Sequence, residues 1–212
     1  AVYSKENNPR LSSITVSMLD KGTVDKSKYD ISNILESIGA EISFISSNHH
    51  INFSAHCLRQ DLPVVVELLT EQLRTPEFSP DELTLLKKRV IANLERSKED
   101  TKKQALIGLL EHLYPIRHIN YKNTIEESIE FVNSVNLSDI KKYHQTTFGL
   151  GSINIIAAGD VPSEKFTGLV NNSFKDWGTQ KLVELDIHAD ANKRKHATGS
   201  MEIKDKTSSD IY

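Results

Sequence analysis

Two neighbouring side chains, Glu111 and His112, have the chemistry of a metallohydrolase site. A glutamate can act as the general base for a water molecule, and a histidine beside it can bind zinc. In the inverted motif His-x-x-Glu-His, the second zinc ligand is a histidine four positions before the last one, and here that position holds Gly108. Because no histidine pair shares one face of this helix, we expect no zinc site at Glu111 and His112.

Three histidines near the end of the first quarter of the chain, His49, His50 and His56, are a second candidate for metal binding. Neighbouring residues of a strand point to opposite faces, and His56 lies roughly 20 Å along the strand from His50. We therefore expect solvent-facing histidines rather than a metal site. The single cysteine, Cys57, alternates inward on the same strand, which predicts a buried thiol without a catalytic role.

The first expected helix begins at an Asn8 cap and ends near Gly22, where a left-handed glycine would close it. Ser13, Val16 and Ser17 share one face of this helix, opposite a more apolar stripe. That face is small and partly polar. A helix that carries ligands needs such a face toward a cleft, and an ordinary amphipathic surface helix has one as well.

The remaining hydrophobic pattern predicts further helices, a two-sided antiparallel hairpin and one buried strand. We expect helices at residues 27–38, 61–73, 79–97, 100–113, 124–133, 137–147 and 163–177, hairpin strands at 40–44 and 51–57, and the buried strand at 152–158. Runs of helices separate the strands, so the order is not a regular alternation of strand and helix. It predicts an α+β fold, with a mostly antiparallel sheet that several helices cover.

The charge balance argues against two classes of partner. The 212 residues include 26 lysines and arginines and 29 aspartates and glutamates, and the net charge is −3 without a long block of one sign. Nucleic acids and anionic membranes attract a surplus of positive charge, so we expect neither as a partner. No apolar run approaches the length that spans a membrane, and no signal-peptide pattern is present.

Several short motifs follow one another in a fixed order along most of the chain. In chain order they are Lys21-Gly22-Thr23, residues 35–40, residues 69–73, Pro76-Glu77-Phe78, His118-Ile119-Asn120-Tyr121, residues 155–161 and Phe174-Lys175-Asp176-Trp177. Together they resemble the pitrilysin/insulinase-like zinc metallopeptidase family, which includes the mitochondrial processing peptidases. The resemblance implies a metallopeptidase-like fold, and it assigns a structural part to His118 and Tyr121 near the cleft of that fold.

The resemblance also shows which positions would carry the chemistry of the family. It places Ser13 and Ser17 where the family has two zinc-binding histidines, Val16 where it has the water-activating glutamate, and Asn93 where it has a third ligand. A catalytic zinc needs about three protein ligands and a base that can reach its water. Two hydroxyls, a valine and an amide supply neither. The resemblance therefore implies a member with no catalytic residues, no metal ligands and no cofactor.

Peptide binding is a property that such a member can keep. Active members of the family hold an extended peptide against the edge of a sheet strand, where main-chain hydrogen bonds provide the affinity. The corresponding residues are Ser43, Phe44 and Ile45, although Ile42 stands where many active members have asparagine. The alternative is that a neighbouring element covers this edge.

The resemblance implies the organisation of the chain and its partners. Residues 1–178 would form the peptidase-like domain, residues 179–199 a linker or long loop, and residues 200–212 an extended segment leading toward a homologous second domain. The implied role is that of a non-catalytic half or subunit, which pairs with an active half of the same family to enclose peptide in a chamber. Two other functions remain open: an active zinc-dependent metalloendopeptidase whose ligands lie outside the aligned motif, and an independent protein-binding scaffold.

Overall fold

The computed structural model describes residues 8–47, 50–116, 118, 120–178, 199–200 and 203. The chain divides into two compact units, the first comprising residues 1–84 and 136–184 and the second residues 85–135 and 185–212. Most of the expected linker and of the expected C-terminal extended segment lies outside the described residues. Each unit is considered by itself below.

A β-hairpin lies in the first unit. Its strands, β1 (Glu41–Ser46) and β2 (Ile51–His56), pair in antiparallel register, with Glu41 opposite His56 and Ser46 opposite Ile51. In the described part of the chain these two strands make up the whole sheet. The alternation of apolar and polar residues predicted this hairpin, and the α+β class is confirmed.

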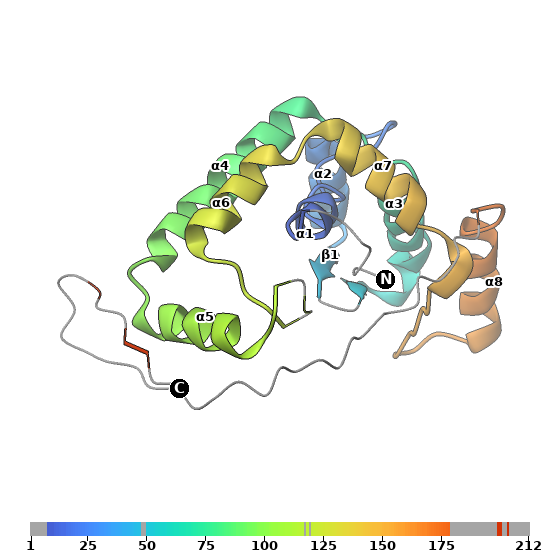
Figure 1. The fold of residues 1–212 in the computed structure, drawn as a ribbon. Helices are drawn as coiled ribbons and strands as arrows, with labels where there is room; N and C mark the ends of the chain where they lie inside the picture. The colour runs from blue at the N-terminus through green and yellow to red at the C-terminus, as the bar shows by residue number, and fades with distance from the viewer. Residues whose placement is uncertain are drawn as a thin grey trace. The chain divides into compact units, whose positions relative to one another are not determined.

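Helices account for most of the remaining described part of the first unit. They are α1 (Leu11–Val16), α2 (Lys28–Ser37), η1 (Arg59–Asp61), α3 (Leu62–Arg74), α7 (Leu137–Thr147), η2 (Leu150–Ser152) and α8 (Ser163–Ser173). Helix α1 packs against α7 and β1, α2 packs against β1, and α3 packs against α8 (Figure 1). The fully buried side chains of this core include Met18, Leu19, Leu68, Ile140 and Tyr143.

The second unit is helical in its described part. Helix α4 (Pro80–Ser97) starts in the first unit and continues in the second, where α5 (Thr101–Leu113) and α6 (Ile125–Ser134) follow. In the described part of the second unit, the buried residues are Leu86, Leu94, Ile125, Val132 and Val135, together with the polar Ser128. Among all described residues, no helix combines the length and the apolar character that crossing a membrane requires.

Capping residues explain where several helices begin. The Ser27 hydroxyl accepts a hydrogen bond from the Asp30 N–H, and the Asp30 carboxylate accepts one from the Ser27 N–H, so that two donors at the helix end are satisfied. Thr124 caps α6 and Asn136 caps α7 through the same reciprocal arrangement. The predicted start of α2 at Ser27 is therefore confirmed, with its capping pair.

Two expected helix ends are wrong. Helix α1 stops at Val16 instead of continuing toward Gly22, because the next amides bond three residues back, from Met18 to Thr15 and from Leu19 to Val16. Such bonds tighten the chain into turns. Helix α8 stops at Ser173, four residues before its expected end at residue 177.

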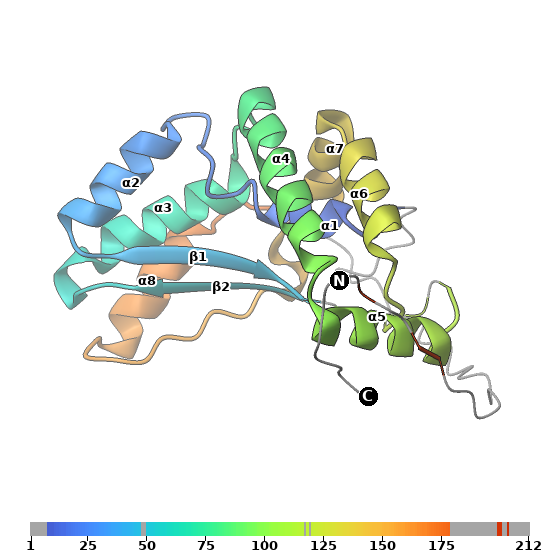
Figure 2. The ribbon, with the colours of Figure 1, turned by 90° about the vertical axis from the view of Figure 1, so that its left-hand side faces the viewer.

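The expected buried strand at residues 152–158 is also wrong. Residues 153–158 are extended but pair with no strand in the described part of the chain (Figure 2). The side chains of Ile153 and Ile155 are half-buried, whereas Ile156 is 91% exposed. An alternating apolar segment becomes a buried strand only when neighbouring strands and a second layer cover it, and here those neighbours are missing among the described residues.

Candidate functional site

Helix α1 and its C-cap carry Ser13, Val16 and Ser17, three of the four residues that the resemblance aligns with the family's catalytic positions. The Ser13 hydroxyl is half-buried and donates to the Arg10 carbonyl oxygen at 3.0 Å, a local bond within the helix. Ser17 is exposed and forms the C-cap of the short helix. Val16 between them is only 1% exposed, so the residue that the resemblance aligns with the general base is a buried hydrocarbon side chain.

These side chains do not fit a zinc ion. Zinc in proteins is bound by thiolate, imidazole or carboxylate groups, whereas a serine hydroxyl is neutral near pH 7 and a weak donor to the metal. The fourth position, Asn93, lies on the part of α4 that belongs to the second unit, and its amide is exposed. Neither the serines nor the asparagine carries the negative charge or the imidazole nitrogen that such a site requires.

The other metal candidates from the sequence do not assemble either. Among the described residues, no group of three histidine, cysteine, aspartate or glutamate side chains is placed to hold a metal ion. His112 is exposed on α5, and His50 and His56 are exposed at the two ends of β2. His49 lies outside the described residues. For the described candidates, the expectation of solvent-facing histidines is confirmed.

Cys57 follows β2 and is partly buried. Burial raises the pKa of its thiol, and the negative charge of Asp61 raises it further. A thiol with a raised pKa is a weak nucleophile near neutral pH, because little of it is ionised. The expected buried position on the strand is not what the structure has, because Cys57 lies just after the end of β2 and is only partly buried.

The Lys-Gly-Thr motif after α1 has a structural reason to persist. Gly22 has φ of +120°, and a β-carbon there would lie 3.0 Å from Glu77 Oε2. The Gly22 carbonyl accepts the Glu77 N–H at 3.1 Å, and the buried Thr23 donates its N–H to the Lys26 carbonyl at 2.8 Å. The first bond attaches the motif to the segment that follows α3, and the second closes the turn after the motif.

An ion pair completes this attachment. Lys26 Nζ donates to the Glu71 carboxylate on α3, and this hydrogen bond raises the pKa of Lys26. The other carboxylate oxygen of Glu71 lies 3.5 Å from the Thr23 hydroxyl. The Lys-Gly-Thr segment and α3 are thus one packed structure, so its presence in the sequence reports the fold and not the activity.

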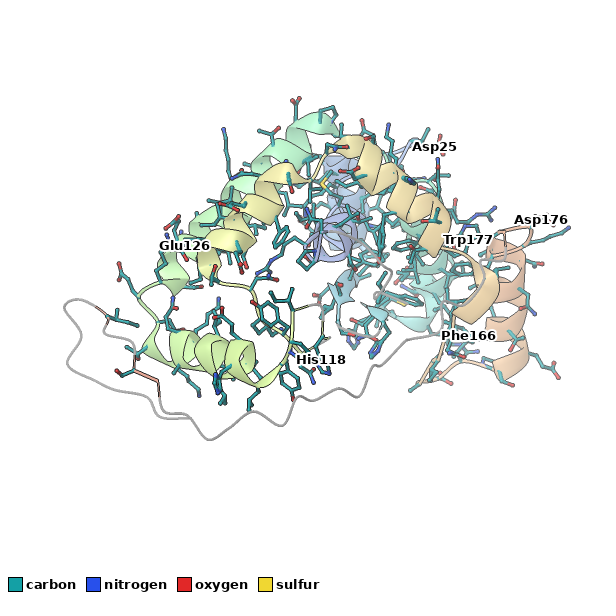
Figure 3. The ribbon with its side chains drawn as sticks, in the orientation of Figure 1. Asp25, His118, Glu126, Phe166, Asp176 and Trp177 are labelled. Atoms are coloured by element: carbon teal, nitrogen blue, oxygen red, sulfur yellow. The ribbon has the colours of Figure 1, made fainter. Side chains whose placement is uncertain are left out.

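His118 and Tyr121, the element near the family's cleft, form a local turn in the second unit. The ring of His118, which is labelled in Figure 3, stacks on Tyr114 with their centroids 4.4 Å apart, and its Nδ1 accepts the Asn120 N–H at 3.1 Å. The Tyr121 N–H donates to the His118 carbonyl at 2.9 Å. These contacts stabilise the turn itself, which agrees with the structural part expected for both residues.

The candidate peptide-binding residues lie along β1. Ser43 and Ile45 share one face of the hairpin with their β2 partners Ser54 and Asn52, while Phe44 faces the opposite side with Phe53. The Ser43 and Ser54 hydroxyls are 2.9 Å apart, and Ile45 is 62% exposed. One edge of β1 pairs with β2, and its other edge has no strand beside it in the described part of the chain.

A buried histidine in the first unit escaped the sequence analysis. His144 on α7 is 9% exposed, with Nε2 2.8 Å from the Leu73 carbonyl oxygen. Its ring stacks on Phe148 at 4.7 Å and meets the edge of Phe78 at 5.3 Å. Burial lowers its pKa, which the bond to Leu73 partly offsets. The sequence signal that could have indicated this contact is the spacing of His144 and Phe148, four residues apart at the end of an expected helix.

The pattern that defines the insulinase family of peptidases, peptidase family M16, matches residues 1–128. The chain is 24% identical to the beta subunit of the human mitochondrial-processing peptidase over 174 residues, which cover 82% of the chain and 35% of that subunit. It is 20% identical to an uncharacterized zinc protease of Mycobacterium tuberculosis strain H37Rv over 157 residues, or 74% of the chain and 35% of the protease. The chain thus spans about a third of the length of these curated relatives.

Solved structures with a similar fold come from bacteria. The peptidase M16 inactive domain from Pseudomonas fluorescens superposes with a TM-score of 0.77 at 20% identity, over 86% of this chain and 45% of that one. A protease from Helicobacter pylori gives a TM-score of 0.66 at 18% identity, over 88% of this chain and 44% of the protease. The family pattern covers more than half of the sequence and the fold agrees with it, so the chain belongs to the insulinase family of peptidases, family M16.

Proposed function

We propose that this chain is a non-catalytic domain or subunit of an insulinase-like peptidase, and that it pairs with an active half of the same family to enclose peptide. The observation that carries the proposal is the face of α1. Val16, buried to 1% exposure, stands in place of the water-activating glutamate, with neutral hydroxyls at Ser13 and Ser17 on the same helix. A buried valine can neither accept a proton nor orient water.

The retained structure supports a role within the family. Gly22, Thr23 and Lys26 keep their contacts with the end of α3, although the residues that would use this scaffold for hydrolysis are replaced. The similar solved structure from Pseudomonas fluorescens carries the name of an inactive domain, and the human relative is named as one subunit of a peptidase. A domain without catalytic residues can form part of the chamber wall and contact the enclosed peptide. Cleavage of that peptide then requires a partner that supplies the catalytic residues.

Zinc content and cleavage measured together test the absence of activity. Purified from medium supplemented with zinc, the chain should carry far less than one zinc per molecule by mass spectrometry of the metal. It should also cleave no peptide from a mixture of unstructured peptides. An active family member with an intact motif, handled in parallel, serves as the control. One zinc per chain, removed by a chelator together with peptide cleavage, would instead establish an active metalloendopeptidase.

Peptide binding at the open edge of β1 is the second part of the proposal. Main-chain bonds along an edge strand bind extended peptides with little sequence preference. Ile45 is the exposed apolar residue on this strand. Replacing Ile45→Glu should weaken the binding of a fluorescent unstructured peptide about tenfold, since it removes an apolar contact of roughly 1.4 kcal/mol.

The matched control for this experiment is Asn52→Glu. Asn52 lies opposite Ile45 on the same face of the hairpin but on β2, one strand away from the open edge of β1. The Asn52→Glu variant should bind the peptide with an affinity within about twofold of that of the unaltered chain. Equal losses for the two variants would mean that the face of the hairpin, and not the edge of β1, contacts the peptide.

A further inference from the structure

Phe78 has a backbone conformation that its residue type rarely adopts. Its φ is +52°, in the left-handed region, where a bulky side chain is strained. The side chain is only 5% exposed, and the residue lies just before α4, which begins at Pro80. Strain of this kind persists only where the surrounding packing compensates for it. The contacts of the Phe78 ring therefore help to hold the backbone in this conformation.

One of these contacts is the imidazole ring of His144. The edge of one ring meets the other at 74°, with the centroids of Phe78 and His144 5.3 Å apart. The His144 ring also stacks on Phe148 at 4.7 Å, so it packs against two phenylalanine rings. Histidine is the member of this group of three rings that can gain a charge between about pH 8 and about pH 5. A proton can thus change what Phe78 packs against.

His144 has a hydrogen-bond partner on one ring nitrogen. Nε2 lies 2.8 Å from the Leu73 carbonyl oxygen, which can only accept, so Nε2 carries the hydrogen of the neutral ring. Acid would add the second proton at Nδ1. Among the described residues, Nδ1 has no hydrogen-bond acceptor. A positive charge in a buried site without an acceptor for its proton is costly.

No counter-ion for this charge is found among the described side chains of the surrounding elements. The acidic residues there are Glu71, which binds Lys26, Glu82, which binds Lys28, Asp139, which caps α7, and the exposed Glu67, Glu77 and Asp81. The basic residues, which supply no acceptor, are Arg10, Arg74, Lys141 and Lys142. Tyr143, a buried neighbour on α7, bears no charge near neutral pH. Burial is accordingly the main influence on the pKa of His144, and it lowers that pKa.

The start of α4 depends on the backbone around Phe78. The Glu77 N–H donates to the Gly22 carbonyl at 3.1 Å, and the Leu83 N–H donates to the Ser79 carbonyl at 3.0 Å in the first turn of α4. Phe78 lies between Glu77 and Ser79, so a change in its φ moves the groups that make both bonds. All of these residues belong to the first unit.

We propose that His144 is a pH-sensitive switch for the start of α4. Protonation at Nδ1 drives the ring out of its contacts with Phe78 and Phe148. Phe78 then leaves its positive-φ conformation, and the first turn of α4 opens together with the bond from Glu77 to Gly22. The inference goes beyond the proposed function, because the switch lies within the first unit and operates whether or not the chain pairs with an active half.

Hydrogen exchange of single amides, followed by NMR, tests the switch on the intact chain. The protection factors of the Glu77 and Leu83 amides should fall about tenfold or more between about pH 7 and about pH 5. A protection factor compares each amide with an unstructured one at the same pH, so the pH dependence of exchange itself cancels. The reference is the Ile31 amide, which bonds to the Ser27 carbonyl at 3.1 Å in the same unit. Its protection should change by less than about twofold.

Two matched variants assign the effect to His144. The side-chain amide of His144→Gln can donate to the Leu73 carbonyl but does not ionise, so the protection of Glu77 and Leu83 should stay within about twofold across this pH range. His56→Gln makes the same chemical change at an exposed histidine at the end of β2. This variant should show the same loss of protection as the unaltered chain. The midpoint of that loss should coincide with protonation of the His144 ring, measured by NMR of its nitrogens.

Four results would overturn the proposal. Unchanged protection of Glu77 and Leu83 while the His144 ring takes up its proton means that the charged ring stays in place. An equal fall at Ile31 means that the first unit opens as a whole. A fall that persists in His144→Gln means that another group is responsible. In the unaltered chain, a fall at a pH where the His144 ring does not titrate means the same, even if the variant does not fold. None of these results bears on zinc content or cleavage, so the proposed function is tested separately.

Discussion

Gly22 and Ser17 lie close together in the sequence but are constrained in different ways. Gly22 has φ of +120°, a conformation that strains any other residue type, and a β-carbon there would lie 3.0 Å from the Glu77 carboxylate. Ser17 is exposed at the end of α1, where many side chains would fit. An exposed position such as Ser17 tolerates many side chains, whereas a position that shapes the turn, such as Gly22, does not. The retained Lys-Gly-Thr is therefore explained without invoking activity.

Replacing Gly22→Ala should destabilise the first unit by about 1–3 kcal/mol, because alanine is strained at positive φ. Its β-carbon would also press against Glu77 Oε2 at 3.0 Å. Urea unfolding followed by Trp177 fluorescence measures the loss. Gly168→Ala is the control: Gly168 lies inside α8, and its β-carbon would meet nothing within 4 Å. That change should instead stabilise by roughly 0.5–1 kcal/mol. Similar losses for both variants would contradict the assigned role of Gly22.

His144 predicts a dependence of stability on pH. Burial holds its folded-state pKa below the usual value of 6.5, so unfolded chains bind the proton more readily than folded ones. The contribution is fully present above pH 6.5 and is lost as the pH falls through 6.5 toward the lower folded-state pKa. Between pH 7 and 5 the midpoint of urea unfolding should fall. A His144→Gln variant, which can still donate to Leu73 but does not ionise, should lose part of that slope. Parallel curves for the two proteins would contradict the prediction.

Helices and strands differ in how far the sequence predicts them. Helix starts depend on local side chains such as Ser27 and Thr124, and the hairpin depends on alternation between adjacent segments, so both follow from short stretches of sequence. The end of α1 was missed because the tightening after Val16 leaves no mark in the hydrophobic pattern. The buried strand predicted at residues 152–158 is wrong because a strand requires partners, and the residues of this segment do not reveal whether partners are present.

The capping pair of α6 gives a prediction at the scale of one element. The Thr124 hydroxyl accepts the Glu127 N–H at 3.1 Å, and Glu127 Oε2 accepts the Thr124 N–H at 3.0 Å. Thr124→Ala should reduce the stability of the second unit by about 1 kcal/mol, and Thr124→Ser should restore most of it. Hydrogen exchange at the buried Val132 on α6 measures the effect. If serine and alanine behaved alike at this position, the cap would not be what stabilises α6.

At the scale of the whole molecule, the candidate site shows the limit of sequence reasoning. Family resemblance identified Ser13, Val16 and Ser17 as replaced positions, and their local chemistry follows from residue type alone. The burial of Val16 and the contacts of His144 depend on packing between elements far apart in sequence, such as α3 and α7. The chain covers 35% of the human relative, so most of that protein's length has no counterpart in these residues.

Pairing with an active half gives the final prediction. Mixed with an active insulinase-family domain that carries an intact zinc motif, the chain should form a one-to-one complex in sedimentation velocity and raise peptide cleavage. A stable complex of this kind buries roughly 1,200–2,000 Å². The double variant Ser13→Ala/Ser17→Ala should support cleavage equally well, because the Ser13 hydroxyl bonds to the Arg10 carbonyl at the N-cap of α1 and Ser17 is an exposed cap. If cleavage fell with the double variant while the complex remained intact, the serines would be taking part in the reaction. If the two proteins sedimented separately, the chain would act as an independent scaffold.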